Sequence, residues 1–194
     1  MALRDVRLNG EVKLARIRTD SVATCLKGGD RRSIGRADEI ASLILREHGR
    51  LGELWGCLQN TDPLARMRAA DALEKISRVL PDAFEPYREA LLTAKLEDGS
   101  AEVRWHLIAI TSRLALQASE AARFYAYLDQ CLHRDTSRIV KVAALQAAYD
   151  LAVKFPQLSA EFNAMRVFAR SSPWPSVIAR AARLIPKEVG RLDT

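Results

Sequence analysis

The stretch TDPLARMRAADALEKI, residues 61–76, decides the fold because it joins a turn to an amphipathic helix. The dipeptide Asp62-Pro63 favours a turn, and proline is well accommodated in the first turn of a helix that follows. Apolar side chains then recur every three or four residues, at Met67, Ala70, Leu73 and Ile76. This spacing places them on one face, so the stretch predicts a helix that packs against other helices.

The same arrangement recurs along the chain. In the quoted stretch Arg68 follows Asp62 by six residues, and three further pairs have this offset: Asp30 and Arg36, Asp98 and Arg104, Asp135 and Lys141. A fifth copy has Arg180 at the basic position and Trp174 in place of the acid. The basic positions are 32, 36, 37 and 39 residues apart. We therefore predict tandem repeats of one supersecondary unit.

Each repeat is predicted to contain two helices. The basic position opens the second helix of each pair, over residues 33–48, 64–79, 101–116, 137–154 and 176–187. The first helices are expected over residues 20–27, 50–60, 82–97, 119–134 and 157–171. About five helix pairs at this period predict an all-α fold, an α-solenoid in which each pair buries its apolar face against its neighbours.

The two ends of the chain differ from the repeats. Within residues 1–19, Asn9-Gly10 stands between short alternating segments, a pattern that favours a β-hairpin. Because a lone hairpin is marginally stable in water, a flexible basic arm or a small cap on the first repeat is the alternative. We predict an N-terminal arm or cap at 1–19, a repeat domain at 20–188 and a C-terminal tail at 189–194.

The turn aspartate, the basic residue six positions later and the Ala/Leu-rich helix that follows resemble the short type of HEAT repeat. The resemblance covers about residues 20–188. It implies that these acidic and basic residues link successive repeats as a ladder, which here would consist of Asp30, Arg36, Asp62, Arg68, Asp98, Arg104, Asp135, Lys141 and Arg180. The periods are shorter than the usual HEAT length of about 40 to 47 residues. A tetratricopeptide array has a similar period, but its Trp, Gly-Tyr and Pro pattern is not met.

Composition limits the classes of protein to consider. The 194 residues are 48% hydrophobic, which suits a folded domain, and apolar runs are too short to span a membrane. Without a secretory signal pattern, a cytoplasmic location is the default expectation. Three widely spaced cysteines, Cys25, Cys57 and Cys131, fit buried reduced thiols better than a disulfide framework.

No catalytic, cofactor or metal motif occurs in the sequence, so we expect a protein that is not an enzyme. His48, His106 and His133 lie in three different repeats, without metal-ligand spacing around them. One enzyme class is an alternative through the resemblance, because certain DNA glycosylases that excise alkylated bases are built of HEAT-like repeats. Trp105 and His106 could face such a cleft, but the next acidic residue is Glu120, beyond the helix.

The charge distribution suggests where a partner binds. Net charge is +6, and the expected second helices carry 14 basic and 7 acidic residues against 8 and 9 on the first helices. The resemblance implies that second helices line a concave surface. Its two basic ends would flank a less polar middle at Leu107, Thr111, Ala144 and Ala148, in this register or one residue away.

This pattern favours a non-catalytic scaffold or adaptor that takes up a segment of another protein, with apolar contact at the centre and charge at the rim. The alternative is a DNA-binding protein, although a continuous basic track is not evident. No cofactor is expected. The residues predicted to touch a partner are Arg66, Lys75, Arg78, Trp105, His106, Arg113, Arg183 and Lys187.

Overall fold

The computed structural model describes residues 20–28, 35–47, 49–93 and 100–185, which are helices joined by turns, with no strand in these ranges. Contacts divide the chain into two compact units, residues 1–83 and 84–194, here called unit 1 and unit 2. Several predictions fall outside the described residues, namely the N-terminal arm, the C-terminal tail, Asp30, His48, Asp98 and Lys187.

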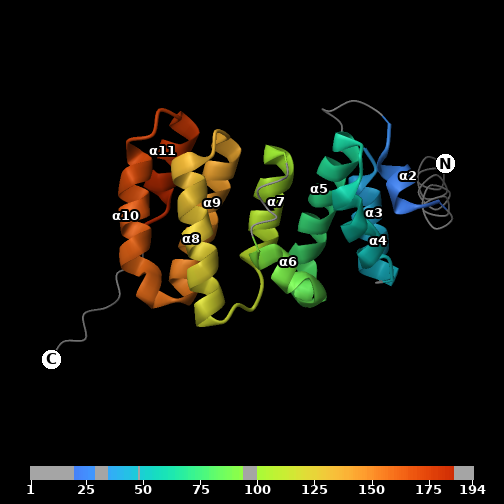
Figure 1. Ribbon diagram of the computed structural model, residues 1–194, viewed down its shortest axis with the longest axis horizontal. Helices are drawn as coiled ribbons and strands as arrows, with labels where there is room; N and C mark the ends of the chain where they lie inside the picture. The colour runs from blue at the N-terminus through green and yellow to red at the C-terminus, as the bar shows by residue number, and fades with distance from the viewer. Residues whose placement is uncertain (1–19, 29–34, 48, 94–99, 186–194) are drawn as a thin grey trace, which may run out of the picture. The chain divides into compact units, whose positions relative to one another are not determined.

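Unit 1 is organised around one long helix. It consists of α2 (Val22–Leu26), α3 (Ala37–Glu47), α4 (Leu51–Gly56), the 3-10 turn η1 (Cys57–Gln59) and α5 (Pro63–Val79). Helix α5 packs against α2, α3 and α4, which are coloured blue to cyan in Figure 1. Large apolar side chains from all four helices are fully buried, among them Leu26, Ile40, Leu54 and Leu73.

The start of α5 follows directly from the quoted sequence. Asp62 caps the helix, because its carboxylate accepts a hydrogen bond of 2.9 Å from the backbone N–H of Leu64. Pro63 occupies the first helical position, where its missing N–H costs no hydrogen bond. Ala65, Ala69 and Ala72 are fully buried, so small side chains let α5 approach its neighbours closely.

Unit 2 contains the remaining helix pairs. The 3-10 helix η2 (Pro81–Tyr87) crosses from one unit to the next, and α6 (Arg88–Leu92), α7 (Ala101–Thr111), α8 (Ala118–Arg134), α9 (Arg138–Lys154), η4 (Pro156–Leu158), α10 (Ser159–Arg170) and α11 (Pro175–Arg183) follow. Helix α9 packs against α7, α8, α10 and α11. In Figure 1, α8 lies beside α9 and α10 lies beside α11. The second helices of this unit are therefore α7, α9 and α11.

Two predicted helices are shorter or less regular than expected. Helix α7 ends at Thr111 rather than near residue 116, because the chain turns at Ser112 and buries Leu114 and Leu116. The helix expected from residue 82 begins as η2, since Pro86 has no N–H for an α-helical hydrogen bond.

Other sequence predictions concern burial and membranes. All three cysteines are buried thiols, and burial raises the pKa of Cys25 and Cys57. Among the described residues, no helix has both the length and the apolar character needed to span a bilayer. Within the same ranges, no three His, Cys, Asp or Glu side chains gather as metal ligands would.

Candidate functional site

A line of polar side chains crosses the three second helices of unit 2. Gln146, Asp150 and Lys154 are spaced four residues apart on α9, so they share one helix face. The Gln146 side-chain amide donates to Asp150 Oδ1 at 2.9 Å. On the α11 side, Arg180 Nη1 donates to Gln146 Oε1 at 2.7 Å, and on the α7 side Lys154 Nζ donates to the carbonyl oxygen of Ser112 at 2.8 Å.

Asp150 is the carboxylate at the centre of this line. Burial is the largest influence on it and raises its pKa above the ordinary value. The hydrogen bond from Gln146 and the positive charges of Lys154, Arg113 and Arg180 act in the opposite direction. We call Arg113, Gln146, Asp150, Lys154 and Arg180 the polar row.

Exposed apolar side chains accompany the polar row. On α9, Ile139 is 44% exposed and Val153 is 53% exposed, and their spacing from Gln146 places both on its helix face. Ile178 on α11 is 38% exposed but lies two residues from Arg180, about 200° around that helix. Arg183, one of the predicted partner-binding residues, is also exposed on α11. The exposed surface of these helices therefore includes both hydrophobic side chains and hydrogen-bonding groups, a mixture found in protein–protein interfaces.

The predicted less polar middle is wrong in its register. Leu107, Thr111, Ala144 and Ala148 are all buried, and one residue further Ile108, Ser112 and Leu145 are buried as well, while Tyr149 is half-buried. The accessible row runs two residues further, through Gln146 and Asp150 on α9 and through Arg113, which follows the end of α7. Two residues turn a helix by about 200°, which exchanges its core face for its solvent face. The middle of the surface is thus polar and charged.

Two basic residues predicted to contact a partner are neutralised within unit 1. Lys75 bonds to Asp71 at 2.7 Å and also to Asp38 on α3. The guanidinium of Arg78 bonds the carboxylate of Glu74 at 2.7 Å, and only 2% of the Glu74 side chain is exposed. The charges of Lys75 and Arg78 are thus balanced or slightly outweighed by those of Asp38, Asp71 and Glu74. In this respect the surface of unit 1 around them differs from the polar row.

The other predicted partner-binding residues lie in more closed surroundings. Arg66 Nη1 donates to the carbonyl of Asn60 at 2.6 Å and so holds the turn before α5. His106 is 4% exposed and its ring lies against that of half-buried Trp105, with a centroid separation of 3.5 Å. Because His106 is enclosed, these two residues do not form an open cleft for a base.

The residues proposed as a ladder make several kinds of contact. Arg104 forms a bidentate ion pair with Asp135 of the following repeat, with Nη2 2.9 Å from Oδ2 and Nε 3.1 Å from the same oxygen. Arg68 donates to the carbonyls of Leu26, at 2.8 Å, and Gly28. Lys141 donates to the carbonyl of Leu132, Arg180 donates to Gln146, and Arg36, in the turn before α3, pairs with Glu39 in the first turn of α3.

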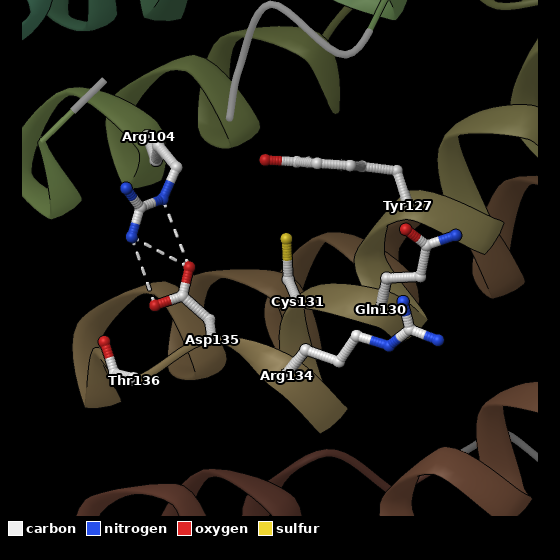
Figure 2. Close-up of a pocket in the computed structure, with 7 residues that line it drawn as sticks. All are labelled: Arg104, Tyr127, Gln130, Cys131, Arg134, Asp135 and Thr136. Atoms are coloured by element: carbon white, nitrogen blue, oxygen red, sulfur yellow. Dashed lines mark hydrogen bonds and ion pairs between the residues drawn. The ribbon is translucent and has the colours of Figure 1, made fainter. Parts of the chain in front are cut away.

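A separate pocket of about 330 Å³ lies beside the ion pair of Arg104 and Asp135. Figure 2 shows the two charged groups joined at one side, with the Tyr127 hydroxyl directed toward Arg104 and the Cys131 thiol directed toward the Tyr127 ring. Burial raises the pKa of Tyr127, so its hydroxyl remains neutral. Gln130, Arg134 and Thr136 complete the lining. The sequence analysis did not anticipate this pocket.

The sequence analysis also missed three members of the polar row, Gln146, Asp150 and Lys154, and assigned Arg180 to the ladder alone. Their spacing of four residues on a predicted helix was a usable signal. It was not distinctive, because solvated helix faces commonly carry such spacing.

Comparisons with known proteins agree with this architecture. The family model of the HEAT repeat domain matches residues 27–189. Among solved structures, the designed armadillo repeat protein YIII(Dq)4CqI superposes with a TM-score of 0.54 at 19% sequence identity, covering 84% of this chain and 79% of that chain. No curated protein matches the chain. The structural likeness concerns the fold alone.

Proposed function

Because this chain belongs to the HEAT repeat domain family, we propose that it is a non-catalytic scaffold or adaptor that binds a partner protein on the second helices of unit 2. The observation that carries this proposal is the surface around the polar row. Exposed Ile139 and Val153 share the α9 face of Gln146 and Asp150, so a partner could bury apolar area and form hydrogen bonds on one face. Repeat proteins commonly use such surfaces for binding.

The contacts of the acidic groups support a role without catalysis. Asp135 is engaged by Arg104, Glu74 by Arg78 and Asp150 by Gln146. These carboxylates hold helices and turns together, whereas general acid or base catalysis requires a group that can reach a substrate proton. Enclosure of His106 likewise gives no support to the base-excising alternative.

Site-specific crosslinking tests the proposed face. A photoreactive residue at Val153, which is 53% exposed on α9, should capture a protein partner from cell extract. The matched control places it at Ala126, which is exposed on the first helix α8. Crosslinks to the same partner from both positions, or from Ala126 alone, would contradict the proposed face.

Charge reversal provides a second test of this face. The Arg183→Glu variant should weaken partner capture and leave the melting temperature unchanged, because Arg183 is exposed. Its control is Arg170→Glu, an exposed charge reversal at the end of α10. Equal capture by both variants would argue against the second-helix surface.

The nucleic-acid alternative needs its own assay. Retention of random duplex DNA at low salt that disappears at moderate salt would indicate binding to the phosphate backbone. We expect no such retention, because within the described part of unit 1 Lys75 and Arg78 are paired with carboxylates.

A further inference from the structure

Two cations of the polar row, Lys154 and Arg180, donate to neutral acceptors. Lys154 Nζ donates to the Ser112 carbonyl at 2.8 Å, and Arg180 Nη1 donates to the Gln146 amide oxygen at 2.7 Å. Such partners fix the position of each side chain without cancelling its charge. Asp150 is the carboxylate that faces these two cations and Arg113. Lys154 and Arg180 thus place two positive charges beside the one negative charge of Asp150.

Unit 1 shows what a neutralised arrangement looks like in the same chain. Lys75 contacts two carboxylates, those of Asp38 and Asp71, and Arg78 contacts the buried carboxylate of Glu74. An acidic partner would gain little there, because it would compete with acids already in place. On the second helices of unit 2, Lys154 and Arg180 donate to neutral acceptors instead of carboxylates. An acidic partner would therefore be attracted to unit 2 in particular.

The second helices of unit 2 also carry a larger excess of positive charge than its first helices. In unit 2, the second helices and the turn after α7 carry seven basic residues and two acidic ones: Arg104, Arg113, Arg138, Lys141, Lys154, Arg180 and Arg183, with Glu102 and Asp150. The first helices α6, α8 and α10 carry five basic and four acidic residues. Arg104 is paired with Asp135 in the turn before α9, so the positive excess rests on α9 and α11, the helices that carry Gln146, Asp150, Lys154 and Arg180.

On the basis of the proposed function, we propose that the partner segment is acidic and places an Asp or Glu carboxylate against Arg180 and Lys154. Exposed Ile139 and Val153 lie on the same face of α9 as Gln146 and Asp150, so the segment also carries apolar residues beside its carboxylates. Asp150 acts as an opposing charge. It favours partners with enough acidic residues to outweigh it and disfavours neutral ones.

Peptide binding measured by fluorescence anisotropy tests this inference directly. The probe is a fluorescein-labelled peptide in which Glu is interspersed with Leu and Ala, and two matched peptides replace every Glu with Gln or with Lys. The Glu peptide should bind to the full chain, at least about tenfold more tightly than the Gln peptide, which corresponds to about 1.4 kcal/mol. Equal binding of the Glu and Gln peptides would overturn the inference.

Variants of opposite sign locate the site. Arg180→Gln and Lys154→Gln should each weaken the Glu peptide about fivefold or more, whereas Asp150→Asn should tighten it about threefold, as charge pairs in partly buried sites allow. The control Arg123→Gln removes an exposed cation from first helix α8 and should change nothing. Thermal melts establish that each variant is folded. Weakening by Arg123→Gln equal to that by Arg180→Gln would place binding elsewhere and overturn the inference.

Two further experiments distinguish an acidic protein partner from nucleic acid, and distinguish failure of this inference from failure of the proposed function. Duplex DNA that displaces the Glu peptide and responds to the same variants would assign the row to nucleic acid and refute an acidic protein partner. A partner crosslinked at Val153 together with no preference for Glu over Gln would refute the acidic partner while leaving the scaffold function intact. Failure to crosslink at Val153 would refute the proposed function itself.

Discussion

At the scale of single residues, Arg68 shows how the core of a repeat accommodates a cation. Its side chain is 1% exposed, and the guanidinium donates to backbone carbonyls at the end of α2. Gly35, with a φ of +57°, makes room for it, because a Cβ at that position would lie 2.8 Å from Arg68 Cζ. The residue therefore connects α5 to the preceding repeat through main-chain groups.

Loss of this side chain should destabilise unit 1 strongly. The Arg68→Ala variant removes buried hydrogen bonds and leaves both carbonyls and a cavity behind, so we expect a loss of about 3 kcal/mol in the free energy of unfolding. Urea denaturation measures it. The control Arg66→Ala lies two residues away on the same helix, is only partly buried, and should cost about 1 kcal/mol or less. Equal losses in the free energy of unfolding would show that the buried contacts of Arg68 contribute no more stability than the partly exposed contacts of Arg66.

Asp150 should make stability depend on pH. Its pKa is raised in the folded state, chiefly by burial, so the folded protein binds the proton more tightly than the unfolded chain. Stability then falls as pH rises from the unfolded value of about 3.9 through the folded pKa. Asp150→Asn keeps an oxygen that can accept from Gln146 and loses the charge. It should melt higher than the wild type at pH 7.

The advantage of the Asn variant should shrink as pH falls, because Asp150 itself becomes neutral. Circular dichroism melts between pH 3 and pH 8 measure the difference. A variant that melts lower than the wild type at pH 7, with the gap closing in acid, would show that attraction by Lys154, Arg113 and Arg180 outweighs burial.

At the scale of helices, local signals predicted most boundaries. Helix α5 begins at Pro63 and α9 begins at Arg138, each within one residue of its predicted start, because caps and turn residues are encoded nearby. Helix α7 was predicted too long, since the apolar period continues through Leu114 and Leu116 after the helix has ended. Periodicity reports burial, and a buried turn produces the same signal.

The candidate site was predicted less well, for a related reason. Its second-helix location follows from charge partition, but the rotation of each helix depends on packing against neighbours in other repeats. An error of two residues placed buried Ala144 and Ala148 on the expected surface and hid Gln146 and Asp150. Partners distant in sequence, such as Arg180 and Gln146, cannot be read from either helix alone.

The junction of α7, α8 and α9 depends on Asp135. Its carboxylate accepts both from the Arg104 guanidinium and, at 2.7 Å, from the backbone N–H of Ser137, which opens α9. The two side chains are 17% and 11% exposed, so the pair is largely shielded from solvent. A double-mutant cycle with Arg104→Gln and Asp135→Asn should give a coupling energy of about 1–3 kcal/mol. Additive effects would mean that the ion pair does not couple these helices.

At the scale of the whole chain, the division into two compact units suggests that damage in one unit remains largely within it. Stability of repeat proteins approximates a sum of repeat and nearest-neighbour terms, so regions can open separately. Arg68 donates to the carbonyls of Leu26 and Gly28, which lie with it in unit 1, whereas Arg104 and Asp135 lie in unit 2.

Native-state hydrogen exchange can therefore distinguish the two units. Arg68→Ala should reduce amide protection in α3 and α5 by about two orders of magnitude while leaving α8 and α9 nearly unchanged, since about 1.4 kcal/mol corresponds to a factor of ten. Arg104→Gln should instead reduce amide protection in α7 and α8 while leaving α3 and α5 nearly unchanged. If either variant instead lowers protection equally in all these helices, the chain unfolds as one cooperative body, and the contacts that divide it do not set its energetic units.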